Sequence, residues 1–181
     1  LIKLKQLEKD NKRLREILSL QRLSDSESIS ASVISRKTSS FWRQIILNKG
    51  AKDGVEVGNF VVGPGGLLGR VHDTSLFTAS VQLLTSPESK VGVWVERIQS
   101  HGLLVGLGND YPKVIFYDKN IDIKVGDFVL SSPASTLLPP NIPIGVIQSI
   151  DKELRAKKSA NILLLGKPQA IDWVQILKVE L

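Results

Sequence analysis

The chain has 181 residues with no cysteine, no methionine and a formal net charge of +6. The lack of cysteine excludes disulfides and thiolate metal sites, and two histidines alone do not make a zinc set. Residues 1–22 hold seven basic and three acidic side chains, whereas the other 159 residues carry 17 basic and 15 acidic ones. A nearly neutral globular part argues against nucleic-acid binding, which needs a basic face on the folded module.

Residues 1–23 form the longest helical pattern, and we predict that they form a coiled-coil helix. Its seam residues are spaced 3, 4, 3 and 4 apart, and they are Leu4, Leu7, Asn11, Leu14 and Leu18. In a parallel dimer the flanking charges attract one another, Lys3 with Glu8 and Asp10 with Arg15. An asparagine in such a seam favours a two-stranded parallel state. We therefore predict a homodimer interface made by these five seam residues; the alternative is an amphipathic helix packed on its own barrel.

Three heptads are marginal for a coiled coil. The chain starts at Leu1 and has no methionine, so we expect the coil to continue into a further N-terminal segment. No apolar run of the given sequence approaches the roughly 18 to 20 residues that a membrane-spanning helix needs, and it contains no signal-peptide pattern; we expect either feature, where it exists, in the preceding segment.

A polar stretch at 24–28 is the predicted linker, and short apolar runs with frequent turn residues follow it. The predicted strands are Ile29–Arg36, Arg43–Asn48, Phe60–Val62, Leu67–His72, Thr78–Leu84, Val91–Arg97, Gly102–Leu107, Val114–Tyr117, Phe128–Leu130, Ile144–Ile150, Asn161–Leu165 and Val174–Val179. Short strands with turn signals about every ten residues indicate a sandwich or barrel rather than a parallel α/β sheet.

One sequence pattern occurs twice. The stretch 54–71 reads as strand, glycine turn and strand, and a similar order returns at 125–130 and 143–147. Gly58 and Gly126 lie 68 residues apart, and Gly69 and Gly145 lie 76 apart. The alternative is that unrelated β-structure reuses the same turn chemistry; we favour two related small β-barrels in tandem.

We predict a mainly β fold in which the helix is followed by two β-barrel lobes. Five strands precede Ser86–Glu88 and seven follow, so a balanced pair needs the C-terminal strands to return. The predicted first lobe is therefore 24–86 plus 151–181, and the second is 87–150. Three prolines predict an exposed loop at Ser131–Asn141, and Lys152–Ser159 is a predicted hairpin tip.

The sequence shows no convincing catalytic, cofactor-binding or metal site. His72 stands beside Asp73, but successive strand side chains point to opposite faces, so this run is not a triad. The glycines at 63–66 lack a following Lys-Ser/Thr and predict a hairpin turn rather than a phosphate cradle. A double-barrel hydrolase, active or degenerate, would need a cleft with His72 or His101 bonded to a serine hydroxyl.

The aromatic residues allow a second alternative, a stacking platform for single-stranded nucleic acid. The residues concerned are Phe41, Trp42, Trp94 and Trp173. Because the globular part is nearly neutral, we expect them to be barrel core or lobe-interface anchors instead, and we predict no nucleic-acid partner.

After the heptad helix, a series of segments resembles the MreC family of bacterial rod shape-determining proteins over essentially the whole chain. The segments are V-I-S-R (33–36), F-W-R-Q-I-I-L-N-K-G-A-K-D-G-V-E-V-G-N-F-V-V (41–62), G-L-L-G-R-V (66–71), V-Q-L-L-T-S (81–86), G-L-L-V-G-L-G (102–108), V-G-D-F-V-L-S-S (125–132) and P-I-G-V-I (143–147). Their order and spacing make the match specific. In this chain Pro133 and Asn141 stand where the family usually has glycine; the first change alters the loop more, because proline cannot take a positive φ.

The resemblance implies a non-enzymatic scaffold of the cell-elongation (rod-shape) complex. It implies that the full protein is anchored by one membrane-spanning helix, with its lobes on the extracytoplasmic (periplasmic) side of the cytoplasmic membrane. The implied partners are a second copy of the chain, higher self-assemblies, cell-wall (peptidoglycan) synthases and membrane proteins of that complex; no cofactor is implied.

Overall fold

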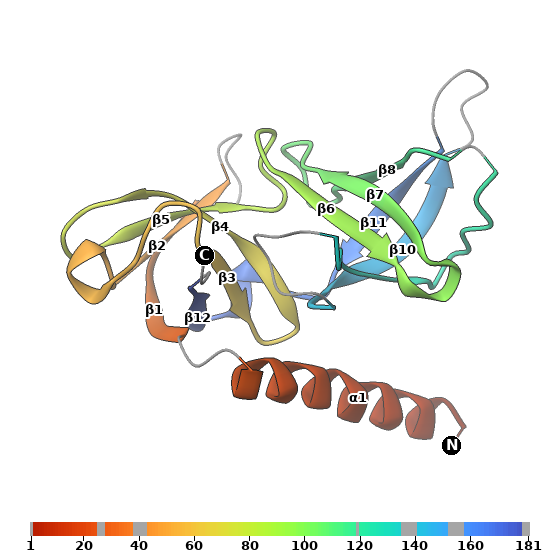
Figure 1. Cartoon of the computed structure of the whole chain (residues 1–181), viewed down its shortest axis with the longest axis horizontal. Helices are drawn as coiled ribbons and strands as arrows, with labels where there is room; N and C mark the ends of the chain where they lie inside the picture. Colours follow the sequence, from red (N-terminus) through yellow and green to blue (C-terminus); the bar gives the residue numbers. More distant parts are fainter. Residues whose placement is uncertain are drawn as a thin grey trace.

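The computed structural model describes residues 2–24, 28–37, 43–118, 120–134, 141–151 and 158–178. This part of the chain folds into one N-terminal helix and two closed barrels of six antiparallel strands (Figure 1). The predicted fold class, a helix followed by two small β-barrels, is confirmed. Helix α1 (Ile2–Ser24) lies along one side of the two barrels.

The first barrel is closed in the order β1-β12-β3-β4-β5-β2. Its strands are β1 (Ser28–Lys37), β2 (Gln44–Leu47), β3 (Phe60–Gly63), β4 (Gly66–Thr74), β5 (Ala79–Leu83) and β12 (Trp173–Leu177). Buried and less buried residues alternate along β2 and β5, as expected when one face of a strand lines a core. Ile45, Val81 and Ile176 are among the fully buried side chains at its centre.

The second barrel is closed in the order β10-β11-β8-β7-β6-β9. Its strands are β6 (Lys90–Val95), β7 (Ser100–Val105), β8 (Lys113–Phe116), β9 (Phe128–Ser131), β10 (Pro143–Asp151) and β11 (Ser159–Leu164). Short 3₁₀ turns lie at Ala51–Asp53, Glu96–Ile98 and Pro168–Ala170. Each of the twelve strands predicted from the sequence is present, with ends shifted by a few residues at most.

The expected return of residues 151–181 to the first lobe is wrong for β11. That strand pairs with β10 from Gly145–Leu164 to Asp151–Ser159, and it also pairs with β8, so it closes the second barrel. Pairing with the strand next in sequence closes the shortest loop and so costs the least chain entropy, which favours β10–β11 pairing. Only β12 among the described strands after β10 crosses back, and it pairs with β1 and β3.

The repeat seen in the sequence is a repeat of structure. Gly58 and Gly126 both take positive φ, at 100° and 95°. Gly58 N–H donates to the Val71 carbonyl at 2.8 Å, and Gly126 N–H donates to the Ile147 carbonyl at the same distance. In each barrel the strand register also shifts just after this carbonyl, between Val71 and Asp73 in the first barrel and at the matching point of β10 in the second.

The two barrels superpose in topology if β12 is placed before β1. The first barrel then runs β12, β1, β2, β3, β4, β5, and the second runs β6, β7, β8, β9, β10, β11, with the same neighbours at every step. The first barrel is thus a circular permutation of the second, and its opening strand is supplied by the C-terminal end of the chain.

The two barrels are joined by a shared apolar core. Phe60, Val62, Leu67 and Leu177 of the first barrel belong to the same buried cluster as the core of the second barrel. The hairpin turn that opens β4 fits tightly there, because a Cβ on Gly66 (φ 146°) would overlap the Pro143 carbonyl oxygen of β10. The glycines at 63–66 therefore form a hairpin turn, as predicted, and that turn lies at the contact between barrels.

The loop expected at Ser131–Asn141 is described in part. Asn141 has a φ of 63°, so it accepts the left-handed conformation for which asparagine is suited. Residues 135–140 lie outside the described residues, as do 152–157 of the predicted hairpin tip and Phe41 and Trp42. The expectation of a core or interface position is wrong for Trp173, which lies exposed on β12.

Candidate functional site

Helix α1 carries the predicted dimer seam, and its first half presents that seam to solvent. Leu4 and Leu7 are 58% and 65% exposed, and Asn11 is exposed as well. The side chain of Leu18 lies outside what the structure describes. Two leucines one helical turn apart that contact no core offer an apolar ridge of the kind that a second helix covers.

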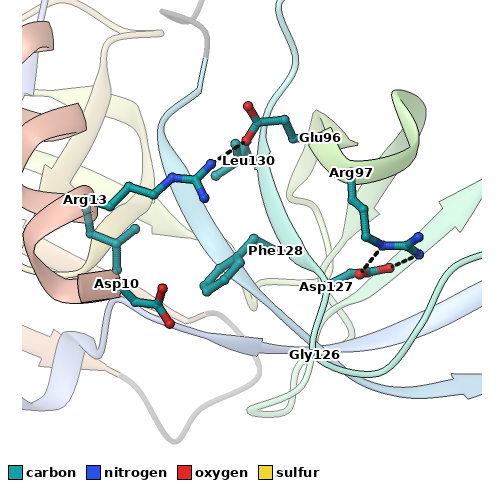
Figure 2. A pocket seen from close by; sticks show the side chains of 9 residues that line it. Asp10, Arg13, Glu96, Arg97, Gly126, Asp127, Phe128 and Leu130 are labelled. Carbon is teal, nitrogen blue, oxygen red and sulfur yellow. Dashed lines mark hydrogen bonds and ion pairs between the residues drawn. The ribbon is translucent and has the colours of Figure 1, made fainter. Parts of the chain in front are cut away.

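The second half of the described seam faces the chain's own body. Leu14 is half-buried, and together with Phe128 and Leu130 of β9 it lines a groove of about 360 Å³ between α1 and the second barrel. Arg13 Nη2 reaches across this groove to Glu96 Oε2 at 3.2 Å (Figure 2). Both side chains are largely exposed, so this ion pair adds little stability. The helix is therefore held weakly against the second barrel, and its packing there is the alternative that the heptad pattern left open.

A second ion pair, between Arg97 and Asp127, lies in the wall of the groove. Arg97 Nε and Nη2 donate to the two carboxylate oxygens of Asp127 at 2.7 and 2.8 Å, a bidentate geometry visible in Figure 2. Asp127 also accepts from the Lys124 backbone N–H at 2.8 Å. The Asp127 side chain is only 8% exposed, and Arg97 is 42% exposed.

These contacts shift both ionisation equilibria. The hydrogen bond from Arg97 holds the pKa of Asp127 below its usual value, with a further contribution from the Lys124 backbone N–H. The same hydrogen bond raises the pKa of Arg97. The pair is therefore charged at neutral pH, and it fixes the turn that carries Phe128 into the groove.

The structure brings together a serine and a histidine that the sequence did not pair. His101 Nδ1 lies 3.0 Å from Ser132 Oγ, which is the contact expected for the hydrolase alternative. The Ser132 hydroxyl also accepts the Ala134 N–H at 3.2 Å, and the imidazole stacks on Trp94 with ring centroids 5.8 Å apart. Among the described residues no carboxylate is hydrogen-bonded to His101, and neither residue lines the groove under α1. A triad needs a third group that orients the base, and the described residues supply none here, so the contact of the exposed His101 with the buried Ser132 does not make a triad.

The described residues also bear on the metal site and on His72. No group of three or more His, Asp or Glu side chains there is arranged to hold a metal ion. His72 lies exposed on β4.

Comparison with known proteins identifies the family to which the two barrels belong. The family model described as "Rod shape-determining protein MreC, barrel core" matches residues 33–178. The chain belongs to the MreC family. The cell shape-determining protein MreC of Caulobacter vibrioides is 30% identical over 173 residues, which are 94% of this chain and 48% of that protein. The chain thus spans about half the length of the curated MreC relatives it matches.

Solved MreC structures share the same fold. A structure described as MreC superposes with a TM-score of 0.80 at 28% identity, covering 95% of this chain and 99% of that one. The MreC chain in a complex with penicillin-binding protein PBP2 from Helicobacter pylori superposes with a TM-score of 0.65 over 84% of this chain and 98% of that one, and its 16% identity establishes likeness of fold alone. In the described residues of the present chain, no helix has the length and apolar character needed to cross a membrane.

Proposed function

We propose that this chain is a dimerising scaffold of the bacterial cell-elongation complex, in which α1 sets the spacing of two copies and the barrels provide docking surfaces for cell-wall synthases. The observation that carries the proposal is the exposed Leu4–Leu7 ridge at the start of a helix attached to a rigid two-barrel body. Such an arrangement suits a role in holding partners at fixed positions, and it requires no catalytic step.

Membership of the MreC family supports the complex and the location. The relatives are cell shape-determining proteins, and the structure of the Helicobacter pylori homologue with PBP2 indicates a synthase as the class of partner. We further propose that the barrels lie on the extracytoplasmic side of the cytoplasmic membrane, anchored there through a segment N-terminal to α1, with membrane proteins of the same complex as additional partners. Higher self-assembly of such dimers would give each synthase several docking points.

The test is the solution mass of this chain across a range of concentrations, measured by light scattering after gel filtration. We expect a concentration-dependent dimer for the wild type and a folded monomer for Leu4→Lys/Leu7→Lys, because lysine ammonium groups facing one another in the seam repel. The matched control is Ile2→Lys. It places one lysine, against two in the test variant, at another exposed apolar residue of the helix that lies outside the seam, and it should leave the dimer intact.

A cellular readout connects the dimer to the function. In a rod-shaped bacterium whose own copy is deleted, the full-length protein with Ile2→Lys should restore rod shape, and the protein with Leu4→Lys/Leu7→Lys should give rounded cells. A wild-type chain that stays monomeric at every concentration, or a seam variant that restores rod shape fully, would contradict the proposal.

A further inference from the structure

A second cavity, separate from the groove under α1, lies where the two barrels meet. It has a volume of about 260 Å³. Its walls come from the residue before β2, the end of β5, the 106–112 loop and the segment after β11, and they include Arg43, Thr85, Asp110, Tyr111, Lys167 and Gln169. We call this cavity the interbarrel cleft. The Gly108 N–H donates to the Thr85 carbonyl at 2.9 Å, so the loop that forms one wall is tied to the opposite barrel.

Arg43 is the most unusual residue of the interbarrel cleft. Its side chain is only 10% exposed, and its Nη1 donates to Asp110 Oδ1 of the other barrel at 2.6 Å. Its Nε–H is buried and has no acceptor in the described part of the chain. Buried polar groups are nearly always hydrogen-bonded, so an unpaired guanidinium N–H on a residue that lines a cavity marks a place where a bound acceptor would be stabilised.

The charges around the interbarrel cleft favour an anion. Its lining holds two cations, Arg43 and Lys167, against the single carboxylate of Asp110. Asp110 is 68% exposed on its side chain and meets Arg43 through one hydrogen bond, so it occupies one edge of the guanidinium and leaves Nε unused. A carboxylate ligand could bind the guanidinium in the planar, two-oxygen geometry that arginine favours.

The shape and lining narrow the ligand further. Three leucines, Leu83, Leu163 and Leu164, line the same space as the two cations. Thr85, Tyr111 and Gln169 add groups that can hydrogen-bond an amide. The volume lies just below the range of about 300–1,000 Å³ that is typical of ligand pockets, so the ligand must be small. A bare ion would leave the leucines uncovered, whereas a chain end offers a carboxylate, an amide and a small apolar side chain together.

We infer that the interbarrel cleft binds the free carboxylate end of a short peptide, with Arg43 as the main anion-binding residue and Lys167 as a second cation. Asp110 is the internal counterion that competes with the ligand for Arg43. The inference does not depend on the scaffold role or on the dimer.

The test is calorimetric titration of this chain with N-acetyl-Ala-Ala in its L,L and D,D forms, alongside the same dipeptides as C-terminal amides and inorganic phosphate. We expect the acids to bind at least about tenfold more tightly than the amides, because the charge-assisted hydrogen bonds to Arg43 are lost in the amide. Tighter binding of the L,L form would assign the ligand to a protein C-terminus, and tighter binding of the D,D form to a cell-wall peptide; both support a carboxylate site.

Three variants separate a binding role from a structural one. Arg43→Gln should weaken binding about tenfold or more, and the exposed Lys167→Gln should weaken it a few-fold without changing the unfolding midpoint. Asp110→Asn should tighten binding, because it removes the competing carboxylate, whereas a purely structural Asp110 predicts weaker binding. Equal affinity for acids and amides, phosphate binding as tight as that of the peptides, or an Asp110→Asn variant that binds no better than wild type would overturn the inference.

Discussion

Asp127 in the second barrel occupies the place that Asn59 occupies in the first. Asn59 Oδ1 accepts the Glu56 backbone N–H at 2.9 Å, and Asp127 Oδ2 accepts the Lys124 backbone N–H at 2.8 Å, in each case three residues back. The difference lies in what else each side chain meets. Asp127 binds Arg97 through both carboxylate oxygens, whereas the neutral Asn59 amide caps its turn without an ion pair among the described contacts.

This pair yields a prediction about pH. Asp127→Asn keeps an oxygen for the Lys124 N–H but loses the charge that binds Arg97, so the variant should unfold more easily than wild type at pH 7. The pKa of Asp127 is lowered in the folded protein, chiefly by the hydrogen bond from Arg97. The stabilisation is therefore fully present above the pKa of an unfolded aspartate, about 3.9, and is lost as the pH falls through the lower folded-state pKa.

Urea unfolding of both proteins at a series of pH values checks this sign. The difference in unfolding free energy should be constant from about pH 7 to pH 5 and shrink toward zero below about pH 4. Glu56→Gln is the control, since it removes an exposed carboxylate from the equivalent turn of the first barrel. A difference that grows as the pH falls would contradict the prediction.

Two glycines should respond very differently to the same added methyl group. Gly66 has a φ of 146°, and a Cβ there would overlap the Pro143 carbonyl of the other barrel; at Gly92 the nearest atom is Ser132 Cβ at 4.0 Å. Gly66→Ala should lower the free energy of unfolding by roughly 2–4 kcal/mol, from backbone strain and overpacking together. Gly92→Ala should stay within about 0.5 kcal/mol of wild type. Denaturant unfolding compares them, and equal losses would show that the turn is not held against β10.

Local pattern was sufficient to predict the strands and the repeat. Alternating apolar residues mark strands such as β5, and the turns at Gly58 and Gly126 need a residue that accepts positive φ, so glycine at both places signals the same turn twice. The heptad spacing likewise predicts a helix where α1 is found. These features depend on neighbours within a few residues of one another.

Contacts between residues far apart in the chain could not be predicted from the sequence in this way. The number of strands on either side of Ser86–Glu88 predicts that both β11 and β12 return to the first barrel. In the structure β11 pairs with β10, and β12 alone returns. Arg43 reads as the start of an ordinary strand, and its partner Asp110 lies 67 residues further on. The groove beneath α1 joins residues of the helix to β9, and no spacing along the chain records that contact.

The shared core predicts that the two barrels unfold together. Leu67 lies on β4 of the first barrel, is fully buried, and belongs to the same cluster as Val93, Phe116 and Ile144 of the second barrel. Leu67→Ala should cost about 2–5 kcal/mol through lost burial and the cavity left behind. Amide signals assigned to strands of both barrels should report this loss in one transition with a common midpoint.

The matched control for that experiment is Leu76→Ala. Leu76 lies exposed between β4 and β5, so its truncation should change the unfolding free energy by less than about 0.5 kcal/mol. Because the free energy is followed in each barrel separately, the experiment distinguishes a shared core from two cores that only touch. If Leu67→Ala lowered the midpoint of the first barrel and left that of the second unchanged, the barrels would be independent units and the cleft between them would not be a rigid site.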